Sequence, residues 1–225
     1  MHYNRPRSTA TWGTMAKDWE IGVDFQRLNR ERPARAQAAI KEAGLAAVLC
    51  FTFDNIRYIT GTHIGEWGRD KFDRYAICPA EGDYFLWDPA PPAKRKSAPW
   101  LEGRVDAPIS TLQGALPPKH GIQDDFAKQI KKAMIDLGIE NQPLGIDLME
   151  LPMLRALEAE GIEVVDGQQA MLNAREVKTQ DEIELLKQAA AMVDGTYYDI
   201  AKAIRPGTRE SDLVAIAHER LYSMG

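Results

Sequence analysis

The segment Leu45–Phe51, with the sequence LAAVLCF, is an unbroken run of apolar residues directly after Gly44. A strand with one solvated face alternates apolar and polar residues, so a short continuous run predicts a strand buried on both faces, in a sheet covered by helices. The preceding segment, 25–43, has apolar residues at helical spacing and predicts a helix that ends at Gly44. Pro33 suits a first turn, so the helix proper is expected to begin near it.

Downstream, strand-like and helix-like segments alternate and are separated by glycine, which predicts an α/β fold with a mixed sheet flanked by helices. After about Asn173 the periodicity is only helical, with helices expected from near Lys178 and near Glu210. Between the apolar run and Asn173 the sequence predicts, first, a turn into a short strand at 54–58 and a hairpin of strands 74–79 and 84–87 around the turn 81–83. It then predicts a helix at 123–137, a strand at 144–147, a helix from about 152 to 161, and a strand at 162–165.

Charge and hydropathy narrow the classes of function. A formal net charge of −5 argues against a general binder of nucleic acid or anionic membranes, because neutralising phosphates needs a basic face. The short basic run 94–96 is interpreted as a solvated turn among prolines. No stretch approaches the roughly 20 apolar residues needed to cross a bilayer, and the N-terminus lacks the apolar core of a secretory signal.

The two cysteines, Cys50 and Cys78, each end an apolar run and show no CxxC spacing. Cysteines in this setting are typical of buried strand residues. Both are therefore predicted to be reduced packing residues, which favours a cytoplasmic protein.

Two ordered sets of motifs resemble a known family. Residues 175–189 fit the pattern R-x-x-K-[TS]-x-x-E-I-x-x-[LM]-x-x-A, and residues 204–210 fit I-x-P-G-x-x-E. Together they resemble the start of the catalytic domain of the pita-bread metallopeptidase family, which includes aminopeptidase P, prolidase and creatinase.

The upstream part resembles the N-terminal domain that precedes the catalytic domain in creatinase and aminopeptidase P. Its marks, in order, are the opening helix into residues 45–48, the pattern N-I-x-Y-x-T-G at 55–61, the strand Gly-Ile-Asp at 145–147, and Leu157-Glu158 ahead of Val165-Asp166. Trp67 and the segments 86–88 and 154–159 also resemble dimethylsulfoniopropionate lyases of the same superfamily.

The resemblance implies an N-terminal extension at 1–24, a creatinase-like N-terminal domain at 25–172, and at 173–225 the first helices of an incomplete pita-bread domain. In that family two Asp, one His and two Glu hold the metals, and all lie beyond the matching point here. The chain alone is therefore expected to hold no catalytic residue and no metal, whereas the parent would hold a divalent metal pair: manganese, zinc, iron or cobalt. The implied partners are the rest of the pita-bread domain, a second copy in a homodimer, and a small-molecule or short-peptide substrate.

The segment 62–71 gathers a histidine, an indole, two cations and two carboxylates between glycines, and such loops on rigid scaffolds often carry recognition. By position, the resemblance implies that Trp67 stacks on or shields the substrate and that Arg69 or Arg74 pairs with a substrate carboxylate. His63 is interpreted as a substrate-contacting or hydrogen-bonded residue rather than a metal ligand, since no further ligand stands at a suitable spacing. The alternative is a solvated hairpin tip.

Several acidic residues could be mistaken for a catalytic pair. Asp124-Asp125 and Asp181-Glu182 open predicted helices and are interpreted as caps. Asp147 and Asp166 each follow a strand, and the sequence leaves open whether they converge. The chain contains no phosphate-loop, dinucleotide, nucleophile-elbow or H-E-x-x-H motif.

Three functions therefore stay open. The chain is expected to be the N-terminal part of a dimetal hydrolase of the Xaa-Pro aminopeptidase and creatinase type, contributing substrate recognition and dimerisation. The first alternative is a metal-dependent lyase on the same fold that acts on a small zwitterion such as dimethylsulfoniopropionate. The second is an interaction module without catalysis, because function resides in a site rather than in a fold.

Overall fold

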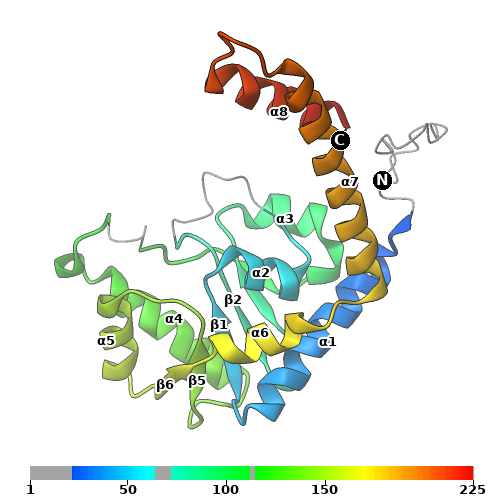
Figure 1. The fold of residues 1–225 in the computed structure, drawn as a ribbon. Helices are drawn as coiled ribbons and strands as arrows, with labels where there is room; N and C mark the ends of the chain where they lie inside the picture. The colour runs from blue at the N-terminus through cyan, green and yellow to red at the C-terminus, as the bar shows by residue number, and fades with distance from the viewer. Residues whose placement is uncertain (1–21, 64–71, 112–114, 225) are drawn as a thin grey trace. The chain divides into compact units, whose positions relative to one another are not determined.

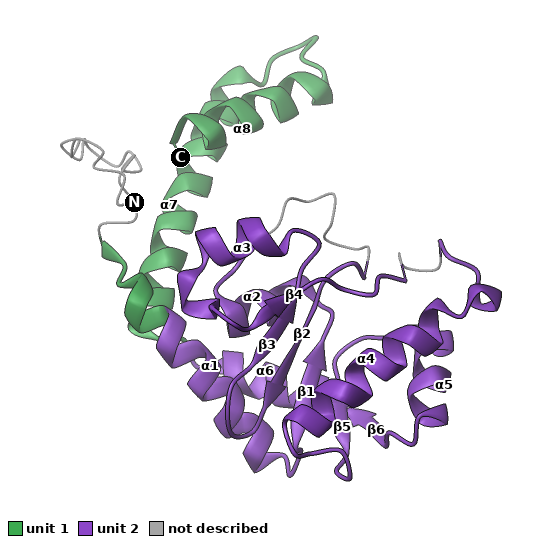
Figure 2. Cartoon of the chain, turned by 180° about the vertical axis from the view of Figure 1, so that it is seen from behind, with its two compact units in different colours: residues 1–28, 178–225 green, residues 29–177 purple. Residues whose placement is uncertain are grey.

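The computed structural model describes residues 22–63, 72–111 and 115–224 of this chain. The chain divides into two compact units, one formed by residues 1–28 and 178–225 and the other by residues 29–177 (Figure 2). Each unit is described by itself below.

The larger unit is built on a six-stranded mixed sheet (Figure 1), with strand order β4-β3-β2-β1-β5-β6. The apolar run at 45–51 supplies the central strand β1, in which every residue is buried, as predicted. Strand β1 is antiparallel to β2 and parallel to β5. The strands are β1 (Ala47–Cys50), β2 (Tyr75–Pro79), β3 (Phe85–Trp87), β4 (Val105–Asp106), β5 (Leu144–Ile146) and β6 (Val164–Asp166).

Helices cover both faces of this sheet (Figure 1), so the predicted fold class is confirmed. On one face α1 (Phe25–Glu42), α2 (Phe53–Thr60) and α6 (Gln168–Glu176) share a hydrophobic core with alternate residues of β1 and β2. On the other face α4 (Ile122–Asp136) and α5 (Leu151–Ala159) share a second core with the remaining residues of those strands.

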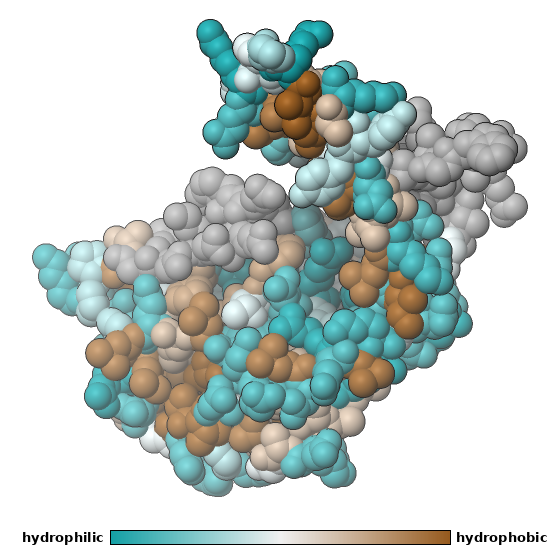
Figure 3. Space-filling model, in the orientation of Figure 1, coloured by the Kyte–Doolittle hydropathy of each residue, from teal (hydrophilic) through white to brown (hydrophobic). Residues whose placement is uncertain are grey.

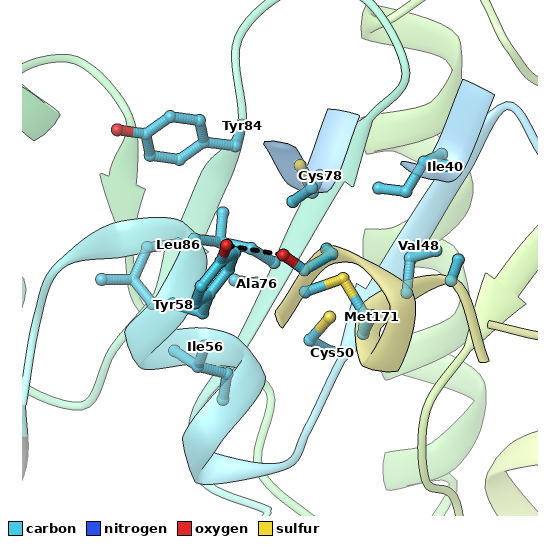
Figure 4. Packing of buried hydrophobic residues seen from close by; sticks show 14 of the residues in the cluster. Ile40, Val48, Cys50, Ile56, Tyr58, Ala76, Cys78, Tyr84, Leu86 and Met171 are labelled. Atoms are coloured by element: carbon cyan, nitrogen blue, oxygen red, sulfur yellow. Dashed lines mark hydrogen bonds between the residues drawn. The ribbon is translucent and has the colours of Figure 1, made fainter. Parts of the chain in front are cut away.

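The two cysteines lie in the first of these cores (Figure 4), where both are free and buried. Burial raises the pKa of the Cys78 thiol to about 12, which keeps the sulfur neutral. In the same core the Tyr58 hydroxyl donates to the Ala174 carbonyl at 2.8 Å and ties α2 to α6. The cysteines are therefore packing residues, as predicted.

Residues 54–58 are helical, so the prediction of a turn into a strand is wrong. The β-branched and aromatic residues that suggested a strand fall on one side of helix α2, where Ile56, Tyr58 and Ile59 are buried. The helix ends at Gly61, whose φ of +65° is the left-handed conformation that favours glycine, and its N–H donates to the Arg57 carbonyl.

Two further predictions that rested on prolines are wrong. Helix α1 begins at Phe25 and continues through Pro33, so the expectation that the helix begins near this proline is wrong. The proline-rich middle contains the short helix α3 (Pro91–Ser97), which starts with proline in its first turn. The run 94–96 therefore lies in a helix rather than in a turn.

Strands β5 and β6 approach closely where two glycines meet. A Cβ atom on Gly167 would lie 2.8 Å from both the Gly145 carbonyl carbon and the Ile146 nitrogen, which are backbone atoms. We therefore expect Gly167→Ala to lower the free energy of unfolding by about 1–3 kcal/mol through overpacking. Urea denaturation measures this change, and Gln169→Ala, at an exposed position in helix α6 directly after Gly167, serves as the control. Equal stability of the two variants would contradict the close approach.

The smaller unit contains α7 (Gln180–Ala203) and α8 (Glu210–Met224), which begin close to the predicted positions. Thr179 and Glu182 form a capping box at the start of α7, as expected for an acidic first turn. Asp181 accepts two hydrogen bonds from the Arg27 guanidinium, at 2.7 and 2.9 Å. This pairing holds Arg27, in the first turn of α1, against the first turn of α7.

Apolar side chains remain on the surface of both long helices in the smaller unit, and other apolar side chains reach the surface elsewhere (Figure 3). Part of the apolar surface of these helices is thus uncovered. The exposed large apolar residues of this unit are Ile183, Leu186, Val193, Tyr197, Tyr198, Ile204, Val214, Leu221 and Tyr222.

Candidate functional site

Asp147, directly after β5, organises the loop between β1 and α2. Its carboxylate accepts hydrogen bonds from the backbone N–H groups of Phe51 and Thr52, at 2.8 and 3.1 Å, and from the Thr52 hydroxyl at 2.7 Å. A fourth bond comes from the Asn55 side-chain amide at 2.8 Å. A negative charge near the N-terminus of α2 also interacts favourably with the helix dipole. The carboxylate therefore sets the direction in which the helix leaves the sheet.

The same network answers whether Asp147 and Asp166 converge. The Asn55 amide also donates to Gln168 at 3.0 Å, and the Gln168 backbone N–H donates to Asp166 at 3.0 Å. The two carboxylates are thus linked through two intervening side chains and do not face each other. Each accepts from fixed donors, which makes them scaffold residues rather than an acid–base pair.

A buried ion pair lies where strands β2 and β3 emerge from the sheet. Arg74 and Asp88 are each only 2% exposed, and the Arg74 Nε donates to the Asp88 carboxylate at 2.8 Å. Lys94 of α3, whose side chain is 14% exposed, brings its Nζ atom to 3.6 Å from the same carboxylate oxygen. The other oxygen of Asp88 accepts from the Ala90 N–H at 3.0 Å.

The Arg74 guanidinium also ties together the two ends of the segment that separates α2 from β2. Its Nη2 donates to the Thr62 hydroxyl, which in turn shares a hydrogen bond with Thr60 at 2.7 Å. On the far side of the segment, Phe72 has a φ of +49°, which is uncommon for an aromatic residue, and its ring packs on Phe51 at 5.2 Å. The residues that flank the segment 64–71, Thr62 on one side and Phe72 and Arg74 on the other, are therefore well packed and form one corner.

His63 lies at this corner among cations. Its backbone carbonyl accepts a hydrogen bond from Lys94 Nζ at 2.9 Å, and its ring meets Phe53 edge-on at 5.7 Å. Burial lowers the pKa of His63, and the nearby charges of Arg57, Lys94 and Arg74 lower it further. The imidazole is therefore neutral near pH 7, in a positive local potential.

Desolvation also lowers the pKa of both buried cations, while Asp88 opposes the shift in each case. The Asp73 carboxylate adds to the field at Arg74 in the same direction as Asp88. Asp88 is thus the shared counter-ion that lets Arg74 and Lys94 remain charged so close together.

Of the four predicted recognition residues, the structure brings His63 and Arg74 to this corner. Trp67 and Arg69 lie outside the described residues. Sequence reasoning missed Asp88 and placed Lys94 in a solvated turn, which is wrong because its side chain is mostly buried. The predicted hairpin could have indicated Asp88, because Arg74 and Asp88 directly flank Tyr75 and Trp87, which pair across strands β2 and β3.

Across residues 22–63, 72–111 and 115–224, no three His, Cys, Asp or Glu side chains gather in a way that could hold a metal ion. No helix in that part of the chain is long and apolar enough to cross a membrane.

Comparisons with known proteins place the chain in a family. Residues 32–177 match the model of the creatinase/prolidase N-terminal domain. Two dimethylsulfoniopropionate lyases DddP are similar to this chain. That of Roseovarius nubinhibens is 27% identical, over 90% of this chain and 47% of its own length. That of Roseobacter denitrificans is 29% identical, over 96% of this chain and 49% of its own length. The chain thus spans about half the length of the curated relatives it matches.

Solved structures share the fold at lower identity. A dipeptidase PepE from Mycobacterium ulcerans superimposes with a TM-score of 0.63 at 23% identity, over 91% of this chain and 52% of that one. An Xaa-Pro dipeptidase from Bacillus anthracis superimposes with a TM-score of 0.61 at 22% identity, over 88% of this chain and 50% of that one. Because the domain model matches residues 32–177, more than half of the chain, this chain belongs to the creatinase/prolidase N-terminal domain family.

Proposed function

We propose that this chain is the recognition part of a creatinase/prolidase-type enzyme and presents the segment 62–74 to a substrate bound by a catalytic domain. The observation that carries the proposal is the corner itself: Thr62 and Arg74, at the two ends of the segment, are hydrogen-bonded to each other over a buried ion pair. Loops that begin and end on one rigid support are suited to precise recognition.

In this proposal His63 and Arg74 form the fixed base of the recognition segment, and Trp67 and Arg69 make the contacts nearest the substrate. A neutral histidine can donate or accept a hydrogen bond, which suits contact with a polar group. The cations around it favour a substrate that carries a carboxylate. The whole enzyme is further proposed to work as a homodimer.

A divalent metal pair would reside in the catalytic domain of the full-length enzyme. The described residues of this chain do not provide a matching set of ligands. What this chain contributes is orientation of the substrate and exclusion of water around it, which together raise the rate of reaction in a bound complex.

Two reactions fit a recognition part of this kind. Cleavage of Xaa-Pro peptides is supported by the fold shared with dipeptidases. Lyase action on a small sulfonium zwitterion is supported by the DddP relatives, which match nearly the whole chain. Assay of the full-length protein with an Xaa-Pro dipeptide and with dimethylsulfoniopropionate separates the two, and activity with neither favours an interaction module.

Trp67→Ala is expected to lower kcat/KM of the full-length enzyme by about tenfold or more, because an aromatic side chain over the substrate excludes water from it. Steady-state kinetics on the reactive substrate measure the change, with Trp67→Phe retaining most of the activity. Metal content of the purified variant should equal that of the wild type. Full activity of a folded Trp67→Ala protein would show that the segment is only a hairpin tip.

Arg69→Ala is expected to act through KM, raising it by about tenfold, if its guanidinium holds the substrate carboxylate equally in the ground and transition states. Arg155→Ala is the matched control, because that arginine is 70% exposed and pairs with Glu158 of its own helix. A KM for Arg69→Ala no higher than that of the control would exclude this contact.

A further inference from the structure

The guanidinium of Arg74 has more donors than the residues around it use. Arginine carries five N–H groups, and here Nε donates to Asp88 while Nη2 donates to Thr62. The Nη1 atom is buried and makes no hydrogen bond. A charged donor left without an acceptor in a buried position is costly, so such a group indicates that an acceptor belongs there.

Asp88 does not supply that acceptor, because Arg74 Nη1 makes no hydrogen bond to it. One of its oxygens accepts from the Ala90 N–H, and the other faces both Arg74 Nε and Lys94 Nζ. The carboxylate therefore orients two cations from different parts of the chain, one directly ahead of strand β2 and one in helix α3, toward the same corner. Asp73, whose charge also acts on Arg74, contributes to holding the guanidinium charged.

Lys94 has a matching arrangement. Its Nζ donates to the His63 carbonyl at 2.9 Å and lies 3.6 Å from Asp88, a distance longer than a normal hydrogen bond. An ammonium group has three donors, so it has donor capacity left for an external acceptor. Arg57 adds a third positive charge to the same surroundings, as the field at His63 shows.

We propose that Arg74 and Lys94, oriented by Asp88, form an anion subsite beside His63 that takes the carboxylate of a small ligand. A carboxylate has two acceptor oxygens, which can accept from Arg74 Nη1 and Lys94 Nζ at once. This inference rests on the recognition role proposed above and adds to it a second cation and a positioning residue. Both candidate substrates, a peptide and a sulfonium propionate, carry such a group.

The test uses the full chain with acetate as the probe. Protein labelled with ¹⁵N at arginine is titrated with sodium acetate at constant ionic strength, with chloride as the balancing anion, and the Arg74 Nε–H resonance is followed by NMR. The resonance is assigned by its loss in Arg74→Lys. A saturable shift in the millimolar range is expected for the wild type with acetate.

Lys94→Met keeps the apolar stem of the side chain and removes its charge, and it is expected to weaken acetate binding by about fivefold or more. Lys96→Met, at an exposed position of the same helix, is the matched control and should bind acetate like the wild type. Asp88→Asn tests the positioning role: the Arg74 resonance should move in the absence of acetate, and the acetate-dependent shift should be lost.

The subsite is overturned if folded wild-type protein shows no saturable shift, or if Lys94→Met and Lys96→Met bind acetate equally. This result is independent of the kinetic test of Trp67 and Arg69. Acetate binding with fully active Trp67 and Arg69 variants would retain the subsite and remove the recognition segment. If the Trp67 and Arg69 variants are inactive but the wild-type protein does not bind acetate, the recognition segment is retained and the subsite is rejected.

Discussion

Asp147→Ala is expected to lower the free energy of unfolding of the larger unit by about 3–4 kcal/mol. The wild-type carboxylate accepts four hydrogen bonds, two from backbone N–H groups ahead of α2 and two from the side chains of Thr52 and Asn55. Removing the carboxylate leaves several donors in the partly buried loop between β1 and α2 without an acceptor. Urea denaturation followed by near-UV circular dichroism measures the change.

Asp166→Ala is the matched control for this prediction. Asp166 ends β6, whereas Asp147 directly follows β5; Asp166 is exposed and, among the described residues, accepts one hydrogen bond, from the Gln168 N–H. We expect its loss to cost no more than about 1 kcal/mol. If Asp147→Ala were no less stable than Asp166→Ala, the network around Asn55 would not be what directs α2.

Asp88→Ala is expected to cost about 3–5 kcal/mol, because it leaves the buried Arg74 charge without its counter-ion. The Ala90 N–H also loses its acceptor, and Lys94 loses the charge that faces it. The same denaturation experiment applies. The free energy of unfolding of Asp88→Asn should lie between those of Asp88→Ala and the wild type, because an amide keeps one acceptor oxygen but not the charge.

Asp83→Ala provides the control in the same hairpin. Asp83 pairs with Arg104 at 3.0 Å, but its side chain is 81% exposed, and surface pairs of this kind contribute little to stability. A loss for Asp88→Ala that is as small as the loss for Asp83→Ala would refute the view that the buried pair holds this corner together.

The motif residues that suggested the family at 55–61 are largely scaffold. Asn55 links Asp147 to Gln168, Tyr58 bonds the Ala174 carbonyl, and Gly61 supplies the left-handed end of α2. Together they fix the point at which the chain leaves α2 and enters the recognition segment. A pattern of residues can thus mark a family because it positions a site, without contacting a substrate itself.

Helix α2 shows the limit of local patterns. Its eight residues are too short for periodicity to distinguish a helix from a strand, and Ile, Tyr and Thr favour strands. What decides the helix is tertiary: Asp147, from a distant strand, accepts from the residues ahead of the helix, and Gly61 ends it. Neither contact can be read from residues 53–60 alone.

The sequence by itself determined the buried central strand, the hairpin of β2 and β3, the sheet flanked by helices and the start of the last two helices. These follow from periodicity, glycine punctuation and capping, which act within a few residues. The tertiary structure decided which charges meet. Arg74, Asp88 and Lys94 are separated along the chain, and they come together because Arg74 and Asp88 directly flank the paired residues Tyr75 and Trp87 and α3 brings Lys94 to the same carboxylate. Pairing of buried charges depends on contacts between elements, which local sequence does not encode.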